Sequence, residues 1–168
     1  MPLVEVVPHP KTSEHSITTA LGFYKSLGKK PILVRQETPG FVANRLQAAI
    51  NNEAYSLVSR RIVSARDLDL ALTNGPGLRW ALNGPFETNA FGGGGGMKGF
   101  VNRLERLGPE IRHWEDDMAR NRFDWSKASI TELKQSAEEH LGPIDSREAK
   151  RERDGKLLGL LTLKLKND

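Results

Sequence analysis

The chain opens with the stretch Leu3-Val4-Glu5-Val6-Val7, a β-branched run that is typical of a strand. A single strand cannot pair its backbone groups or bury both of its faces. Nearly everything that follows has the residue spacing of helices. The strand therefore either pairs with a second copy of itself or belongs to the end of a larger α/β protein, and the function depends on which of the two holds.

Helical periodicity begins soon after this strand and continues to the C-terminus. Thr12-Ser13-Glu14 supplies hydroxyl caps for a first helix that ends at Gly28, and residues 31–34 form a short extended segment. Further helices are predicted over residues 42–58, 64–72, from 84 onward, 97–120, 129–140 and about 145–166. The predicted fold class is all-α, with six to seven helices behind a vestigial β start.

The composition limits the classes of function. A chain of 168 residues suits one domain with a core, and it has no apolar stretch long enough to span a membrane. The net charge of +4 is spread among acids, so we expect neither a nucleic-acid partner nor a membrane. Cysteine is absent and the first residues do not resemble a signal peptide, which is compatible with a cytoplasmic location.

Two other features of the sequence give little evidence of chemistry. The run Gly92–Gly96 has no preceding strand, so a flexible connector is favoured over a phosphate-binding loop. No GxGxxG fingerprint for a dinucleotide is present. No histidine has a partner at a convincing metal-ligand spacing, so no metal site is predicted. The histidines are His9, His15, His113 and His140.

Two short segments concentrate candidate site residues. In the first, Asn44 stands among apolar neighbours just after Phe41, where its amide either binds backbone or faces a ligand. In the second, Arg79 and Trp80 follow a Gly-Pro-Gly turn. An arginine beside an aromatic residue either recognises an anion or serves packing alone.

Four stretches together resemble the 3-hydroxyacyl-CoA dehydrogenase family, and more closely its λ-crystallin and L-gulonate 3-dehydrogenase branch. They are residues 1–7, Gly28-Lys29-Lys30-Pro31, residues 38–46 and Gly84-Pro85-Phe86-Glu87. The pattern at 75–81 and the Leu-rich terminal helix extend the similarity over residues 1 to about 165. The resemblance implies a helical body like the C-terminal-like domain of 6-phosphogluconate dehydrogenase. It also implies that the first strand is the last strand of an N-terminal Rossmann domain.

The resemblance also implies roles for individual residues. Family members bind NAD in the Rossmann domain, and their helical domain dimerises and completes the substrate pocket. By the match, Glu5 stands where an acid orients the catalytic histidine, and Asn44 stands where an amide contacts the reacting centre. Arg79 matches an arginine near the substrate carboxylate, and Phe41 and Trp80 are expected to be walls of the pocket.

The catalytic histidine, its companion serine and the NAD site all fall before Met1 in this match, and His9 does not align with that histidine. We therefore expect residues 1–168 to be a single helical dimerisation and substrate-pocket domain, with 1–8 as the strand remnant. We expect it to use no cofactor, to form a homodimer, to bind a small acyl or carboxylate ligand, and not to transfer hydride to NAD alone. The alternative is a free-standing non-redox enzyme, a cyclase, isomerase or dehydratase, that reuses the pocket.

Overall fold

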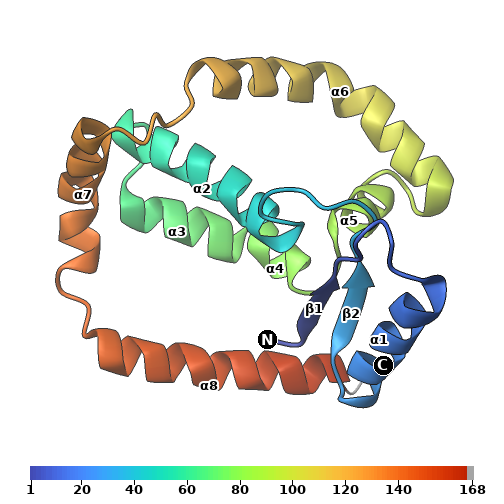
Figure 1. Ribbon diagram of the computed structural model, residues 1–168. Coiled ribbons are helices and arrows are strands. Elements are labelled where there is room, and N and C mark those ends of the chain that lie inside the picture. Colours follow the sequence, from blue (N-terminus) through green and yellow to red (C-terminus); the bar gives the residue numbers. More distant parts are fainter. Residues whose placement is uncertain (166–168) are drawn as a thin grey trace. The chain divides into compact units, whose positions relative to one another are not determined.

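The computed structural model describes residues 1–165 and has, within them, two strands and eight helices (Figure 1). In chain order they are β1 (Leu3–Val6), α1 (Glu14–Ser26), β2 (Lys30–Leu33), α2 (Ala43–Ser59), α3 (Ala65–Asn74), α4 (Pro76–Trp80), α5 (Pro85–Gly92), α6 (Gly96–Arg120), α7 (Lys127–Leu141) and α8 (Ser146–Leu165). The predicted all-α body behind a short β start is confirmed. The helix that was not predicted is α4, which has five residues and lies where the sequence suggested only a turn. The last helix was predicted to reach residue 166, which lies outside the described residues.

The chain divides into two compact units, Met1–Asn52 and Glu53–Asp168. In the first unit, β1 and β2 pair in parallel with Leu3 opposite Lys30. α1 connects the two strands and packs on both. The first strand therefore has a partner within its own chain, which the sequence analysis did not predict.

Side-chain caps explain where several helices begin. The hydroxyl of Ser13 accepts the N–H of Ser16 at the start of α1, and that of Ser64 accepts the N–H of Asp67 at the start of α3. Each hydroxyl satisfies an amide that has no carbonyl partner within its helix. The cap at the start of α1 was predicted from the sequence and is confirmed, and the helix predicted from residue 64 begins with the second cap.

In the second unit, the glycine run joins α5 to α6, and these two helices pack together. The N–H groups of Gly93 and Gly95 both donate to the carbonyl of Ala90, at 3.2 and 2.8 Å. Three of the five glycines have a positive φ, between 58° and 111°. A Cβ added to Gly93 would lie 1.9 Å from the carbonyl oxygen of Gly99. The run is thus a hydrogen-bonded turn in which the backbone at Gly93 lies close to the backbone at Gly99. It is not the flexible connector that its composition favours.

The C-terminal half of α2 is fixed to the segment that follows α6. The hydroxyl of Ser56, a residue only 2% exposed, donates to the carbonyl of Asn121 at 2.6 Å. Tyr55, Phe123 and Trp125 form a cluster of edge-on rings with centroids 5.2 to 5.7 Å apart. These polar and aromatic contacts join residues of the second unit that are far apart in the sequence.

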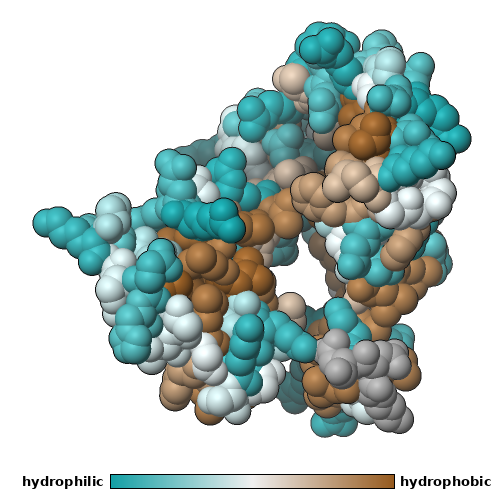
Figure 2. All heavy atoms as spheres, turned by 90° about the vertical axis from the view of Figure 1, so that its right-hand side faces the viewer, coloured by the Kyte–Doolittle hydropathy of each residue, from teal (hydrophilic) through white to brown (hydrophobic). Residues whose placement is uncertain are grey.

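The chain exposes more surface than two compact units of its size would, and many large apolar side chains are part of that surface. Among residues 1–165, the buried apolar side chains are Ile17, Val34, Val58 and Phe123. Two compact units of about 50 and about 115 residues would together expose roughly 9,800 Å², but the chain exposes 13411 Å². Figure 2 shows apolar side chains gathered in patches on the face that it draws. Over residues 1–165, each helix is too short or too polar to cross a bilayer.

Candidate functional site

The carboxylate of Glu5 holds the start of α2. Its Oε1 atom accepts the N–H groups of Val42 at 2.8 Å and Ala43 at 3.1 Å. Amides at the start of a helix have no carbonyl partner within the helix, and a negative charge there is favoured by the helix dipole. Glu5 therefore links β1 to the first turn of α2 within the first unit.

The turn before α2 explains why the helix begins where it does. Thr38 and Phe41 are joined by a backbone hydrogen bond of 3.0 Å. Pro39 and Gly40 occupy the two central positions, and Gly40 has a φ of 78°, which is the pattern of a type II turn. Phe41 also has a positive φ, 47°, which is a strained conformation for a bulky side chain.

Asn44 lies in the first turn of α2, directly after the amide of Ala43 that Glu5 binds. Its side chain is exposed and makes no hydrogen bond within residues 1–165. The structure thus shows no bond from this amide to the backbone, and its contact with a ligand stays a prediction. The first unit thus brings together three of the predicted site residues, Glu5, Phe41 and Asn44.

The other two predicted residues, Arg79 and Trp80, lie on α4 in the second unit. The Arg79 side chain is exposed and has no acidic partner within the described part of the chain, and Trp80 is 43% exposed. Gly75 and Gly77 let α4 approach the end of α3, since a Cβ on each would lie 2.5 and 2.6 Å from the carbonyl oxygens of Ala71 and Leu72. These glycines therefore allow the close contact between α3 and α4, the helix that carries Arg79.

A further contact supports the end of α4. The Nζ atom of Lys164 in α8 donates to the carbonyl of Ala81 at 2.8 Å, just after α4 ends. Because the last carbonyls of a helix carry partial negative charge, a lysine there is favourable. The roles of Arg79 and Trp80 in ligand binding stay predictions.

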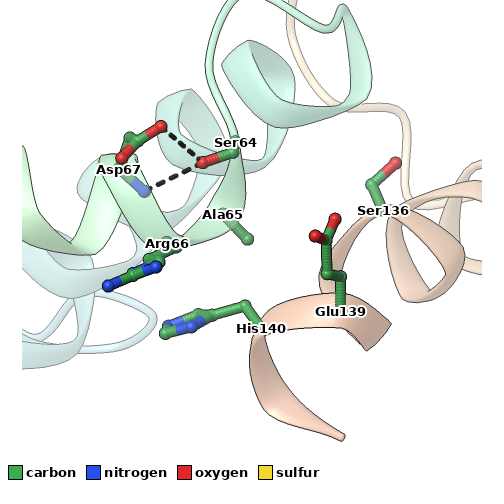
Figure 3. A pocket seen from close by; sticks show the side chains of 7 residues that line it. All are labelled: Ser64, Ala65, Arg66, Asp67, Ser136, Glu139 and His140. Atoms are coloured by element: carbon green, nitrogen blue, oxygen red, sulfur yellow. Dashed lines mark hydrogen bonds between the residues drawn. The ribbon is translucent and has the colours of Figure 1, made fainter.

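The second unit also has a polar cavity that the sequence analysis missed. It has a volume of about 420 Å³, and its lining comes from the start of α3 and from α7 (Figure 3). Those lining residues are Ser64, Ala65, Arg66, Asp67, Ser136, Glu139 and His140. His140 contacts Asp69 through Nε2 and Oδ2 at 3.2 Å. The two residues are 71 positions apart, so no local pattern could have indicated this pair.

Of this pair, only His140 lines the cavity. Figure 3 shows that the Ser64 hydroxyl is used to cap α3, where it binds both the N–H and the carboxylate of Asp67. Within residues 1–165, no group of three or more histidine or acidic side chains could hold a metal ion.

The first unit has a β-α-β arrangement, but its residues do not fit a dinucleotide. A pyrophosphate needs a glycine-rich turn between the strand and a helix with free N-terminal amides. The connection from β1 to α1 instead contains Pro8 and Pro10 and no glycine. At the start of α1, Ser13 already binds the amide of Ser16.

Comparison with known proteins identifies the family. The model of the 3-hydroxyacyl-CoA dehydrogenase C-terminal domain matches residues 40–137, and that of the 3-hydroxyacyl-CoA dehydrogenase NAD binding domain matches residues 1–38. The chain therefore belongs to the 3-hydroxyacyl-CoA dehydrogenase family. It contains the C-terminal domain, preceded by a short segment of the NAD-binding domain, and the recognition from sequence is confirmed.

Individual relatives agree with this assignment. A protein of Gibberella moniliformis named 3-hydroxyacyl-CoA dehydrogenase is 62% identical over 166 residues, which cover 99% of this chain and 52% of that protein. L-carnitine dehydrogenase of Streptomyces coelicolor is 44% identical over 67% of this chain and 35% of its own length. The lambda-crystallin homolog of Mus musculus is 40% identical over 67% of this chain and 34% of its own. The chain thus spans about half the length, or less, of these relatives.

A solved structure supports the fold. The NAD+-dependent dismutase 5-formyl-3-hydroxy-2-methylpyridine 4-carboxylic acid 5-dehydrogenase superposes with a TM-score of 0.63 at 22% identity. The match covers 97% of this chain and 51% of that one. At this identity the likeness concerns the fold alone.

Proposed function

We propose that the chain is the dimerisation and substrate-binding domain of a 3-hydroxyacyl-CoA or hydroxyacid dehydrogenase-like protein, and that alone it does not transfer hydride to NAD. The observation that carries the substrate-binding role is the start of α2. There the Glu5 carboxylate binds the amides of Val42 and Ala43 while the neighbouring Asn44 amide is left without a partner. A binding site requires polar groups that are held in place and still have hydrogen-bonding capacity for a ligand.

Each site residue has a distinct role in this proposal. Arg79 anchors the carboxylate or acyl carbonyl of a small-molecule ligand by a charge-assisted hydrogen bond. Asn44 donates its amide to the reacting oxygen, and Glu5 supplies a carboxylate for proton transfer. Phe41 and Trp80 form apolar walls.

The proposal predicts that NAD and NADH do not bind with useful affinity. The connection from β1 to α1 has no glycine, and the amide of Ser16 is already satisfied by Ser13. Isothermal titration of the full chain with either nucleotide, up to millimolar concentration, should show no saturable heat. Saturable binding in the micromolar range would contradict the proposal and would direct attention to the glycine run at 92–96.

The proposal also predicts a homodimer. The chain exposes several thousand Å² more than two compact units would, and a stable interface buries about 1,200–2,000 Å² in total. In α8, Leu158 and Leu163 are 65% and 60% exposed. Light scattering at micromolar concentration should therefore give twice the chain mass of 18.7 kDa.

Two α8 variants refine this measurement. Leu158→Glu should shift the protein toward the monomer, because it places a charge on the apolar half of the helix. Arg151→Glu, a change in the exposed and charged first half of α8, serves as the control and should leave the mass unchanged. A stable monomer for the unmodified chain would contradict the prediction.

A second candidate is a free-standing non-redox enzyme, a cyclase, isomerase or dehydratase. It is favoured by the presence of an acid, Glu5, and an amide, Asn44, at one helix start. The two candidates differ in one measurement. A non-redox enzyme turns over a 3-hydroxyacyl or 3-ketoacyl substrate without any nucleotide, whereas a substrate-binding domain only binds it.

A further inference from the structure

The two oxygens of Glu5 are not equivalent in the structure. Oε1 accepts both amides at the start of α2, at 2.8 and 3.1 Å, whereas Oε2 makes no hydrogen bond within residues 1–165. The two amides belong to Val42 and Ala43, and Asn44 is the next residue. One atom of β1 thus fixes the backbone immediately before the free amide side chain.

We infer that Glu5 is a positioning residue for Asn44, acting through Oε1 as a clamp on the start of α2, while Oε2 remains the atom available to a ligand. The inference rests on the function proposed above, because that function places Asn44 in the site. Glu5 then has two separable roles. Holding the start of α2 needs only an acceptor oxygen, whereas the proposed proton transfer needs a carboxylate.

The turn before α2 explains why a clamp is needed. Gly40 and Phe41 both have left-handed backbone conformations, with φ of 78° and 47°, and this conformation is strained for a phenylalanine. Such strain persists only where the surrounding contacts hold it. The bonds from Glu5 fall on the two residues directly after Phe41, where a relaxation of the turn would move the first turn of α2 and with it Asn44.

Hydrogen exchange at single amides tests the clamp without any activity measurement. The full chain is compared with Glu5→Ala, Glu5→Gln and the control Glu37→Ala, which removes an exposed acid with no hydrogen bond in the described residues. In Glu5→Ala, exchange at Val42 and Ala43 should accelerate about fivefold or more, as expected when a helix cap is lost. In Glu5→Gln the side-chain carbonyl still accepts both amides, so their protection should be retained, and Glu37→Ala should match the unmodified chain.

The outcomes separate the clamp from the proposed function. Unchanged exchange at Val42 and Ala43 in Glu5→Ala would overturn the clamp, and so would equal loss of protection in Glu5→Gln. If Glu5→Ala does not fold, a loss of protection at Val42 and Ala43 in Glu5→Gln would still overturn the clamp. If the exchange results are as expected but Asn44→Ala leaves the affinity for 3-hydroxybutyrate unchanged, the clamp holds the backbone but positions nothing for the ligand, and the inference is overturned at that step. A loss of affinity in Asn44→Ala that Glu5→Ala shares, with protection at Val42 and Ala43 retained in Glu5→Gln, supports it.

Discussion

Replacing Gly93 with alanine should lower the free energy of unfolding by about 3 kcal/mol, at the upper end of the cost of overpacking. The new Cβ would lie 1.9 Å from the carbonyl oxygen of Gly99 and 2.7 Å from its carbonyl carbon. Both are backbone atoms, so no change of rotamer relieves the overlap, and α5 must move away from α6. Gly99 faces the same restriction, because its Cβ would lie 2.4 Å from the carbonyl oxygen of Ala90.

Urea denaturation followed by circular dichroism measures this effect, with Gly155→Ala as the matched control. Gly155 lies inside α8, in the same unit, and has nothing within 4 Å of an added Cβ. Alanine there should raise stability by about 0.5–1 kcal/mol because it restricts the unfolded chain and favours the helix. If Gly93→Ala behaves like Gly155→Ala, the close approach of α5 and α6 is wrong.

The helices were predictable because their signals are local. The caps at Ser13 and Ser64 act over three residues, and Gly28 has the φ of 70° expected of the residue that ends α1. The apolar spacing between such signals then predicts each helix. α4 was missed because five residues are too few to show a period.

The contacts that define the site could not be predicted because they connect distant residues. The bond from Glu5 to Val42 spans 37 residues, and the contact between Asp69 and His140 spans 71. The pairing of β1 with β2 also depends on α1 folding back on both strands. For the site residues themselves, the resemblance supplied the roles. The residues alone left ligand binding open beside backbone binding for Asn44 and beside packing for Arg79 and Trp80.

The glycine run shows the limit of composition as a guide. Five consecutive glycines are typical of a flexible linker, yet here they form a turn in which Gly93 needs the space and Gly94 needs the positive φ. Both requirements arise from the packing of α5 on α6, and the sequence of the run does not predict this packing.

Replacing Arg79 with alanine should weaken the binding of a carboxylate ligand by about 1.5–3 kcal/mol, or roughly 10- to 150-fold in the dissociation constant. In the described residues the guanidinium has no acidic partner, so its hydrogen-bonding capacity is available to an anion. Its position is fixed by Gly75 and Gly77 against the end of α3. Isothermal titration with 3-hydroxybutyrate, a small hydroxy carboxylate, measures the change.

Three further variants show whether the loss belongs to a directed anion contact. Arg79→Lys keeps the charge but loses the two-pronged geometry of the guanidinium, so it should recover only part of the affinity. His9→Ala and His113→Ala change residues outside the proposed site and should leave the affinity nearly unchanged. Loss of binding in a histidine variant, together with normal binding in Arg79→Ala, would mean that the anion site lies elsewhere on the helical body. A partial recovery in Arg79→Lys, with both histidine variants unaffected, is the pattern expected of a guanidinium that contacts the ligand carboxylate.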